Sequence, residues 1–305
     1  MTHKILEAKD IGWIHINSVN EEDLEYLKQN FRFHHLDYDD IRAGTSLSKI
    51  DTYKHYLFFT FHIPVLRKEE KIVAGNELYI FLNEKHIITL TRDPIVSIEN
   101  LYEHMEKVNK FRTNVLSKGP AFMLYRILMD AFRETQSIIS FLTREVSRLE
   151  EAINHSHDKK ITVDLGKARR NILFLRHLID PQRTIISNLS VSKRQFIAED
   201  LNVYFDDLRD SLDSVWSSSD NLKLFVDGLF DVNEALLSHK TNDVITLLTI
   251  ISASIMVPTF IAGFYGMNVP WLPFAHRPEV VSFVFLFSLS VMLVTVLLIV
   301  KKHRS

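Results

Sequence analysis

The chain has 305 residues, of which 46% are hydrophobic and 24% are charged, and its formal net charge is −2. These proportions resemble those of an average globular protein, and so small a net charge gives no reason to expect nucleic acid as a partner. The sequence contains no cysteine, which excludes disulfide bonds and thiolate chemistry.

The N-terminal part, residues 1–118, carries both strand and helix patterns. Three runs are rich in aromatic and β-branched residues, as is typical of strands, and a fourth alternates weakly. Asn20 and Asp93 stand where they can cap two helices, and Pro94 suits a first helical turn. We therefore predict a cytoplasmic α/β or α+β domain, with α+β preferred, that has strands at 13–16, 55–64, 78–82 and 86–90 and helices at 21–31 and 93–108.

Residues 119–197 are predicted to form a helical hairpin. Apolar residues recur at spacings of three and four from residue 121 to about 153. The polar segment 154–160 interrupts this pattern, and a second helix is expected from residue 163 to about 189, with Pro181 as the expected place of any kink.

A third helical pattern starts at residue 198 and meets no proline before Pro258. We predict one helix over 198–265, first a stalk and then, at about 244–264, a membrane span. Such a helix is about 95 Å long. Its apolar stripe needs partners, and self-association is the simplest way to supply them.

Two segments, 244–264 and 280–300, contain no charged side chain, and each is 21 residues long. A helix of that length covers about 31 Å, close to the thickness of a bilayer core of about 30 Å. The sequence therefore predicts two C-terminal transmembrane helices joined by an external loop, residues 266–279.

The flanking charges predict the orientation, because basic residues favour the cytoplasmic side. Lys240 precedes the first span, the tail 301–305 is basic, and the loop carries only Arg277 as a fixed positive charge. The first ten residues also lack the apolar core of a signal peptide. We expect a multi-pass protein of the cell (inner) membrane with both termini in the cytoplasm. Lys301, Lys302 and Arg304 would form a basic collar near the inner mouth or serve only to set the topology.

The first span carries a stripe of polar and small residues with a period near 3.5. One interpretation is close packing of small residues between two helices. The other is a pore lined by several copies of this helix, continued by a funnel that includes Ser238, Asp231 and Asp207. The stripe and its neighbour Leu248 comprise Asn242, Ile245, Leu248, Thr249, Ser252, Met256, Thr259 and Gly263.

The end of the first span closely resembles the CorA family of magnesium and cobalt transporters. The similarity rests on the Tyr-Gly-Met-Asn motif at 265–268 at the external end of the first of two C-terminal spans. Further matches are at 241–244, 248–251 and 260–263, and the N-terminal patterns at 34–36, 39–41 and 49–51 are similar to the family's early segment. The resemblance implies a homopentameric funnel with membrane, divalent metal ions and identical copies as partners, and no cofactor besides transported and regulatory Mg²⁺.

The resemblance also assigns roles to residues. Gly266, Met267 and Asn268 would form the selectivity motif, and Leu248 and Met256 match pore positions. Neutral amide oxygens of Asn268 suit a hydrated Mg²⁺, which loses water reluctantly and must be released again. Asp207 matches a regulatory metal position on the stalk, with Glu69 and Glu70 near the other half of that site.

Two departures from the family pattern are visible. The external loop is acidic only at Glu279, and Pro258 lies one residue later than the common Met-Pro pair. These departures bear on the attraction of cations to the mouth and on the placing of the constriction around Met256. Separately, a related Zn²⁺ transporter is an alternative, although Met267 is the usual magnesium form.

The sequence has no phosphate-binding loop, HExxH or GxSxG motif. We therefore expect no enzyme activity and an uptake driven by the membrane potential. The resemblance to the family implies that cytoplasmic Mg²⁺ gates this uptake. A membrane-anchored oligomeric scaffold is the remaining alternative, and it leaves the polar stripe in the span unexplained.

Overall fold

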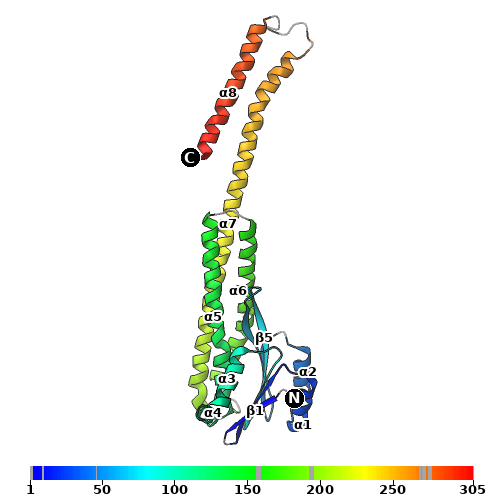
Figure 1. Ribbon diagram of the computed structural model, residues 1–305, viewed down its shortest axis with the longest axis vertical. Coiled ribbons are helices and arrows are strands. Elements are labelled where there is room, and N and C mark those ends of the chain that lie inside the picture. Colours follow the sequence, from blue (N-terminus) through cyan, green and yellow to red (C-terminus); the bar gives the residue numbers. More distant parts are fainter. Residues whose placement is uncertain are drawn as a thin grey trace. The chain divides into compact units, whose positions relative to one another are not determined.

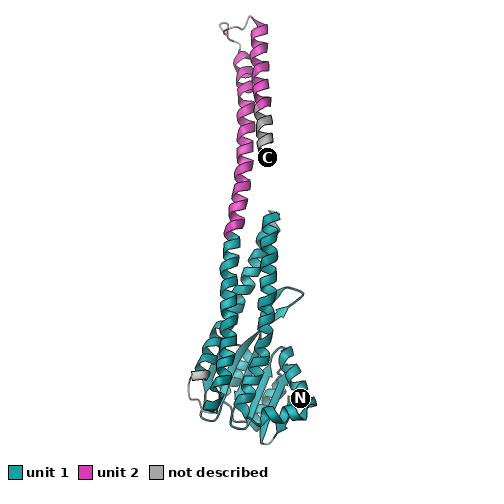
Figure 2. Cartoon of the chain, turned by 90° about the vertical axis from the view of Figure 1, so that its left-hand side faces the viewer, with its two compact units in different colours: residues 1–230 teal, residues 231–305 magenta. Residues whose placement is uncertain are grey.

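A computed structural model describes residues 3–8, 10–45, 47–155, 159–191, 196–267, 269, 273 and 277–304. The chain divides into two compact units, Met1–Phe230 and Asp231–Ser305 (Figure 2). The first unit holds an α+β domain and long helices, and the second holds helical segments (Figure 1). The predicted α+β class of the N-terminal part, followed by a long helix, is confirmed.

The first unit is built on a six-stranded sheet in the order β1-β2-β6-β5-β4-β3. All neighbouring strands are antiparallel except β2 and β6, which are parallel. The sequence patterns located β2, β4, β5 and β6 but missed the edge strands β1 and β3, which have few buried apolar residues. The strands are β1 (His3–Ala8), β2 (Ile11–Asn17), β3 (Lys49–Thr52), β4 (Leu57–Arg67), β5 (Ile72–Leu82) and β6 (His86–Thr91).

Helices cover both faces of this sheet, so its central strands are apolar on both sides. Alternate residues point to opposite faces: Phe58 joins the core beneath helices α1 and α2, whereas Phe61 meets Phe132 of α5 on the other face. The helices of the N-terminal part are α1 (Glu21–Asn30), α2 (His35–Ala43), α3 (Val96–Lys107) and α4 (Asn109–Leu116).

Helix α2 was not predicted, because its acids and histidines hide its short apolar face. Asp37, on the inward face of α2, is fully buried and accepts hydrogen bonds from the Tyr53 hydroxyl at 2.7 Å and the Tyr56 hydroxyl at 2.6 Å. Burial raises the pKa of the Asp37 carboxyl, and the two tyrosine hydrogen bonds oppose that rise. Asp37 therefore stabilises the packing of α2 on the aromatic residues beside it.

The predicted helix at 93–108 begins later than expected. Helix α3 starts at Val96 with Ile95 as its N-cap, so Asp93 and Pro94 lie outside it. Proline disfavours the helical conformation in the residue before it, which keeps Asp93 in the preceding loop.

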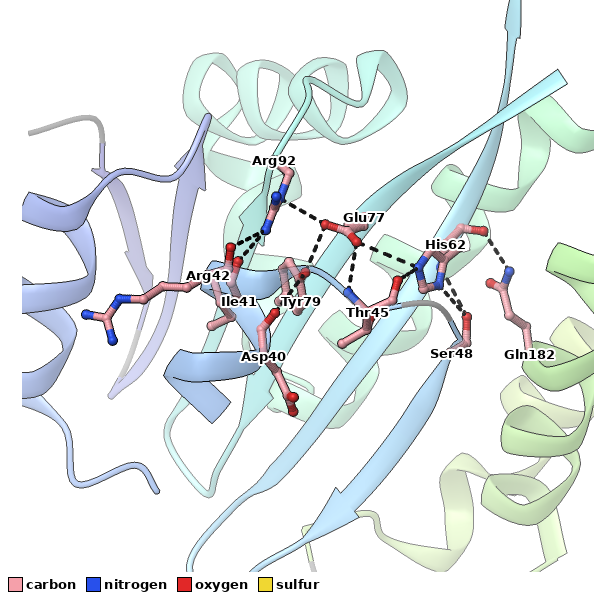
Figure 3. A network of polar contacts seen from close by, with 10 residues as sticks. All are labelled: Asp40, Ile41, Arg42, Thr45, Ser48, His62, Glu77, Tyr79, Arg92 and Gln182. Carbon is pink, nitrogen blue, oxygen red and sulfur yellow. Dashed lines mark hydrogen bonds and ion pairs between the residues drawn. The ribbon is translucent and has the colours of Figure 1, made fainter. Parts of the chain in front are cut away.

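A polar network centred on Glu77 ties the α2 loop to the sheet and to α6 (Figure 3). The Glu77 carboxylate accepts from the Thr45 backbone N–H at 3.1 Å and pairs with Arg92 Nε at 3.0 Å. On the next strand, the backbone carbonyl of His62 accepts from the side-chain amide of Gln182 at 2.7 Å. Because Gln182 is fully buried, this bond joins α6 firmly to β4.

Four long helices follow the N-terminal part in the described residues. Helix α6 continues through Pro181, and helix α7 contains both the predicted stalk and the predicted first span. The helices are α5 (Pro120–His155), α6 (Lys159–Val191), α7 (Asn202–Tyr265), preceded by the short 3₁₀ turn η1 (Glu199–Leu201), and α8 (Pro278–Arg304).

Candidate functional site

The residues of the predicted pore stripe are exposed on one face of α7. Met256 is 71% exposed, Leu248 64% and Ile245 55%, and Asn242, Thr249, Ser252, Thr259 and Gly263 are exposed as well. Small or polar uncharged side chains thus alternate with larger apolar ones along this face, and no other part of the described chain covers it. A face of this kind needs a partner or an aqueous lumen once it lies in a bilayer.

The opposite face of the same segment of α7 lies toward α8. An apolar groove of about 510 Å³ separates the two helices in the second unit. Its α7 wall comprises Ile250, Ala253, Ser254, Val257 and Ile261, and its α8 wall comprises Val284, Phe287, Ser288, Val291 and Met292. None of the predicted pore-lining residues lines this groove, so the polar stripe is directed away from the chain's own second apolar helix.

Two stripe hydroxyls are bound to their own helix. Thr249 Oγ1 donates to the Ile245 carbonyl and Thr259 Oγ1 donates to the Ile255 carbonyl, each at 2.8 Å. A hydroxyl that donates backward in this way retains its oxygen lone pairs. These threonines therefore present acceptors, the kind of group that interacts with a cation or its water.

The Gly-Met-Asn motif begins where α7 ends. The Gly266 N–H donates to the Ala262 carbonyl at 2.9 Å, and a Cβ at Gly266 would lie 3.0 Å from that oxygen. Among the described glycines only Gly44 and Gly119 have positive φ. The requirement for glycine at 266 is thus the close approach of the Ala262 carbonyl oxygen and not a positive φ. Met267 is exposed, and Asn268 lies outside the described residues.

The acids of the stalk fall into two groups that the sequence could not separate. Asp207, Asp210 and Asp231 are exposed, as is Ser238, whereas three other aspartates form ion pairs with arginines of α6. These three are Asp213, Asp220 and Asp227. The sequence does carry a seven-residue repeat of arginine on α6 and of aspartate on α7, but Asp206 shares that repeat and pairs with Arg209 of its own helix, so the repeat alone does not identify the three.

The predicted regulatory residues lie apart within one chain. Asp207 accepts a hydrogen bond of 3.2 Å from the Tyr125 hydroxyl near the start of α5. Burial raises the pKa of Tyr125, and the neighbouring Asp207 raises it further. Glu69 and Glu70 occupy the exposed turn between β4 and β5, where neighbouring Lys71 pairs with Glu145 at 3.5 Å.

Tyr125 and Glu145 are separated by about 30 Å along α5, so a site that uses both predicted halves requires two chains. Within the described residues no group of three or more histidine, aspartate or glutamate side chains is arranged to hold a metal ion. The regulatory site stays a prediction.

The membrane prediction is supported for one helix. The helical segment Glu199–Tyr265 contains an unburied window long and apolar enough to cross a bilayer, and α8 contributes the shorter apolar segment Pro278–Val294. Only the described residues enter this comparison, and the second span at 280–300 stays a prediction. The backbone of Lys301, Lys302 and Arg304 belongs to the last turns of α8, and their side chains lie outside the described part.

The fold defines a class of protein, an α+β domain followed by a long helix whose C-terminal part is long and apolar enough to cross a membrane. More particularly, residues 8–303 match the family model described as CorA-like Mg²⁺ transporter protein, and the chain belongs to this family. Members of the family are ion transporters and not enzymes.

Individual relatives are distant in sequence. The chain is 25% identical to the cobalt/magnesium transport protein CorA of Thermotoga maritima over 263 residues, which covers 86% of this chain and 74% of that protein. It shares the fold of the complete CorA magnesium transporter of Methanocaldococcus jannaschii, with a TM-score of 0.78, 20% identity and coverage of 98% of this chain and 92% of the other. The zinc transport protein ZntB of Pectobacterium atrosepticum is 23% identical over 212 residues, 65% of this chain and 59% of that protein.

Proposed function

We propose that this chain is a channel-like transporter that takes up divalent cations, Mg²⁺ first and Co²⁺ or Ni²⁺ as further cargo, through a homopentameric pore. The observation that carries the proposal is the stripe from Asn242 to Gly263, exposed on the face of α7 turned away from α8. Five such faces around one axis would give the stripe the shared lumen that a single chain lacks.

The external mouth is assigned to Gly266, Met267 and Asn268. Five neutral amide oxygens would hydrogen-bond the water shell of Mg²⁺ without stripping it, and a thioether at Met267 is too soft to ligate this ion. A ring of carboxylates would hold a divalent ion more strongly and slow its release.

The membrane potential is the proposed driving force. Moving one charge across 100 mV is worth about 2.3 kcal/mol, so a divalent ion gains about 4.6 kcal/mol, or roughly three decades of accumulation. No nucleotide is needed for an uptake of this size.

Cytoplasmic Mg²⁺ is the proposed gating ligand. Asp207 of one chain and Glu69 or Glu70 of the next would share an ion, and an empty site would leave like charges facing each other. Their repulsion would loosen the funnel and open the path between Asp231, Ser238 and the pore. Lys301, Lys302 and Arg304 are proposed to surround its inner mouth.

The test replaces the amide at the mouth. Asn268→Ala is expected to abolish growth rescue in a magnesium-starved strain and to abolish potential-driven Mg²⁺ uptake into vesicles, whereas Val269→Ala, one residue further along, retains both. Rescue by Asn268→Ala equal to that of the unmodified chain would contradict the proposed mouth.

Zinc transport is the second candidate, supported by the similarity to the zinc transport protein. Uptake of Mg²⁺, Co²⁺ and Zn²⁺ by the same vesicles separates the two. A preference for Zn²⁺ with no Mg²⁺ flux would replace the magnesium proposal.

A further inference from the structure

Three arginine–aspartate pairs connect α6 to the stalk part of α7. On each helix the paired residues recur every seven positions, and they ascend on one helix as they descend on the other. The pairs are Arg169 Nε to Asp227 Oδ1 at 2.8 Å, Arg176 Nη2 to Asp220 Oδ1 at 3.0 Å, and Arg183 Nε to Asp213 Oδ1 at 2.6 Å. We call this set the α6–α7 ladder.

Trp216 reinforces the ladder between two of its rungs. The guanidinium carbon of Arg183 lies 4.6 Å from the centre of the Trp216 ring, and that of Arg176 lies 5.3 Å from it. A guanidinium can stack on an aromatic face while its N–H groups bind a carboxylate, which an ammonium group cannot do with the same directionality. Each of these arginines therefore holds two side chains of α7 at once.

The ladder distinguishes the observed position of α7 on α6 from its neighbouring positions. Seven residues are close to two helical turns, so the three aspartates share one side of α7. Sliding by one residue misaligns every rung, whereas sliding by seven residues would place another acid, Asp206 or Glu234, opposite the end arginine. The apolar contacts of the same segment, such as Leu212 and Val226, are buried but non-directional, and they discriminate less between such positions.

The ladder also decides which side of α7 stays uncovered. Asp213, Asp220 and Asp227 are partly buried beside arginines, whereas Ser214, Ser217 and other residues on the next side of the helix are exposed. Ser219, on the covered side, is fully buried, and its hydroxyl donates to the Trp216 carbonyl at 2.7 Å.

We propose that the α6–α7 ladder sets the rotation and axial position of the stalk helix, and so selects the face of α7 that each chain presents to its neighbours around the ion path. The second clause rests on the proposed function; the first does not. Arg169, Arg176 and Arg183 are in this sense positioning residues, and they need not touch the ion.

The test exploits the absence of cysteine from the chain. Single substitutions Ser214→Cys, Ser217→Cys and Ser219→Cys are placed in the full chain in membranes. Maleimide labelling then reports exposure within one chain, and oxidative cross-linking reports contact between chains. With the ladder intact, Ser219→Cys is expected to label slowly, and cross-links are expected only at Ser214→Cys and Ser217→Cys.

The ladder is removed by Asp213→Asn, Asp220→Asn and Asp227→Asn together, which keep the side-chain shape but not the charge. We expect labelling of Ser219→Cys to rise and the cross-linking preference for Ser214→Cys and Ser217→Cys to be lost. Asp206→Asn is the matched control, because Asp206 pairs within α7 with Arg209 at 2.8 Å, and it should leave both patterns unchanged.

A reversal of the central rung separates positioning from general stability. Arg176→Asp alone and Asp220→Arg alone are expected to disturb both patterns, and the double variant should restore them. If labelling and cross-linking in the triple asparagine variant match those of the unmodified ladder, the proposal is overturned. This holds whether or not the thermal midpoint of unfolding changes. If labelling changes as expected but no cysteine variant forms cross-links, with or without the ladder, the positioning of α7 by the ladder is supported and the proposed assembly of several chains is contradicted.

Discussion

At the scale of single residues, a buried polar chain beneath α3 illustrates how this domain is held together. His15 is fully buried, with Nδ1 2.9 Å from Thr89 Oγ1 and Nε2 2.8 Å from Glu99 Oε1. Trp13 Nε1 also donates to Thr89 Oγ1, at 2.9 Å. Because Thr89 Oγ1 accepts from Trp13, its hydroxyl can donate a hydrogen bond to His15 Nδ1. In that tautomer the His15 Nε2–H donates a hydrogen bond to Glu99 Oε1. Each group in the chain has a partner, which a buried polar group requires.

This arrangement predicts a pH-dependent contribution to stability. The hydrogen bond from His15 lowers the pKa of Glu99, so its stabilising effect is complete above the ordinary carboxyl pKa and is lost as the pH falls through the lowered value. We expect Glu99→Gln to reduce the free energy of unfolding by about 1 kcal/mol at neutral pH.

Thermal unfolding of the detergent-solubilised full chain between neutral pH and about pH 4 measures this difference. The difference in unfolding free energy between the Glu99→Gln variant and the unmodified chain should become smaller as the pH falls. A gap that widens on acidification would show that the sign of this linkage is wrong.

At the scale of elements, α7 has two sides with different functions. The side toward α5 and α6 is apolar and buried, as Leu212 at 0% exposure shows, whereas Leu224 on the far side is 61% exposed. Periodicity in the sequence predicts an apolar stripe and a separate funnel-facing stripe on this helix. It could not weigh the packing that separates them, because helical drift of about 20° per heptad blurs such assignments over a long helix.

Leu212 and Leu224 provide a matched pair of substitutions. Leu212→Ala should lower the free energy of unfolding by about 2–5 kcal/mol, because it leaves a cavity among packed side chains. Leu224→Ala should cost less than about 0.5 kcal/mol in the unfolding of one chain and should instead weaken association between chains.

Chemical denaturation and size-exclusion chromatography of the two variants measure these effects. Equal losses of unfolding free energy would contradict the assignment of the two faces. A normal assembly of Leu224→Ala would count against this face as the contact between copies.

At the scale of the whole molecule, the proposed feedback gives a direct prediction. Removing the stalk carboxylate with Asp207→Ala should keep Mg²⁺ uptake high when internal Mg²⁺ is high, because the shared ion that holds neighbouring chains together can no longer bind. Uptake into vesicles preloaded with Mg²⁺ is the measurement, and Asp206→Ala on the adjacent position is the control. Normal closure in the Asp207→Ala variant would reject this residue as the sensor.

Much of the architecture is readable from the chain because it depends on local pattern. The central strand run at 57–67 is apolar on both faces, the helices at 120–155 and 159–191 keep a helical period, and residues 244–264 avoid charge over the thickness of a bilayer. The edge strands β1 and β3 and helix α2 were missed, because their short, polar sequences become ordered only by pairing with or packing on the sheet.

The sequence by itself determined the α+β class, the charge-free segments and the Gly-Met-Asn motif, since each is a property of neighbouring residues. Only the tertiary structure decided which aspartates of the stalk are neutralised. Asp213, Asp220 and Asp227 meet their arginines across two antiparallel helices, and that meeting depends on how far one helix is shifted along the other. Contacts between the two helices set that shift, the α6–α7 ladder among them, so no local pattern in either helix alone could specify which acids remain on the exposed face.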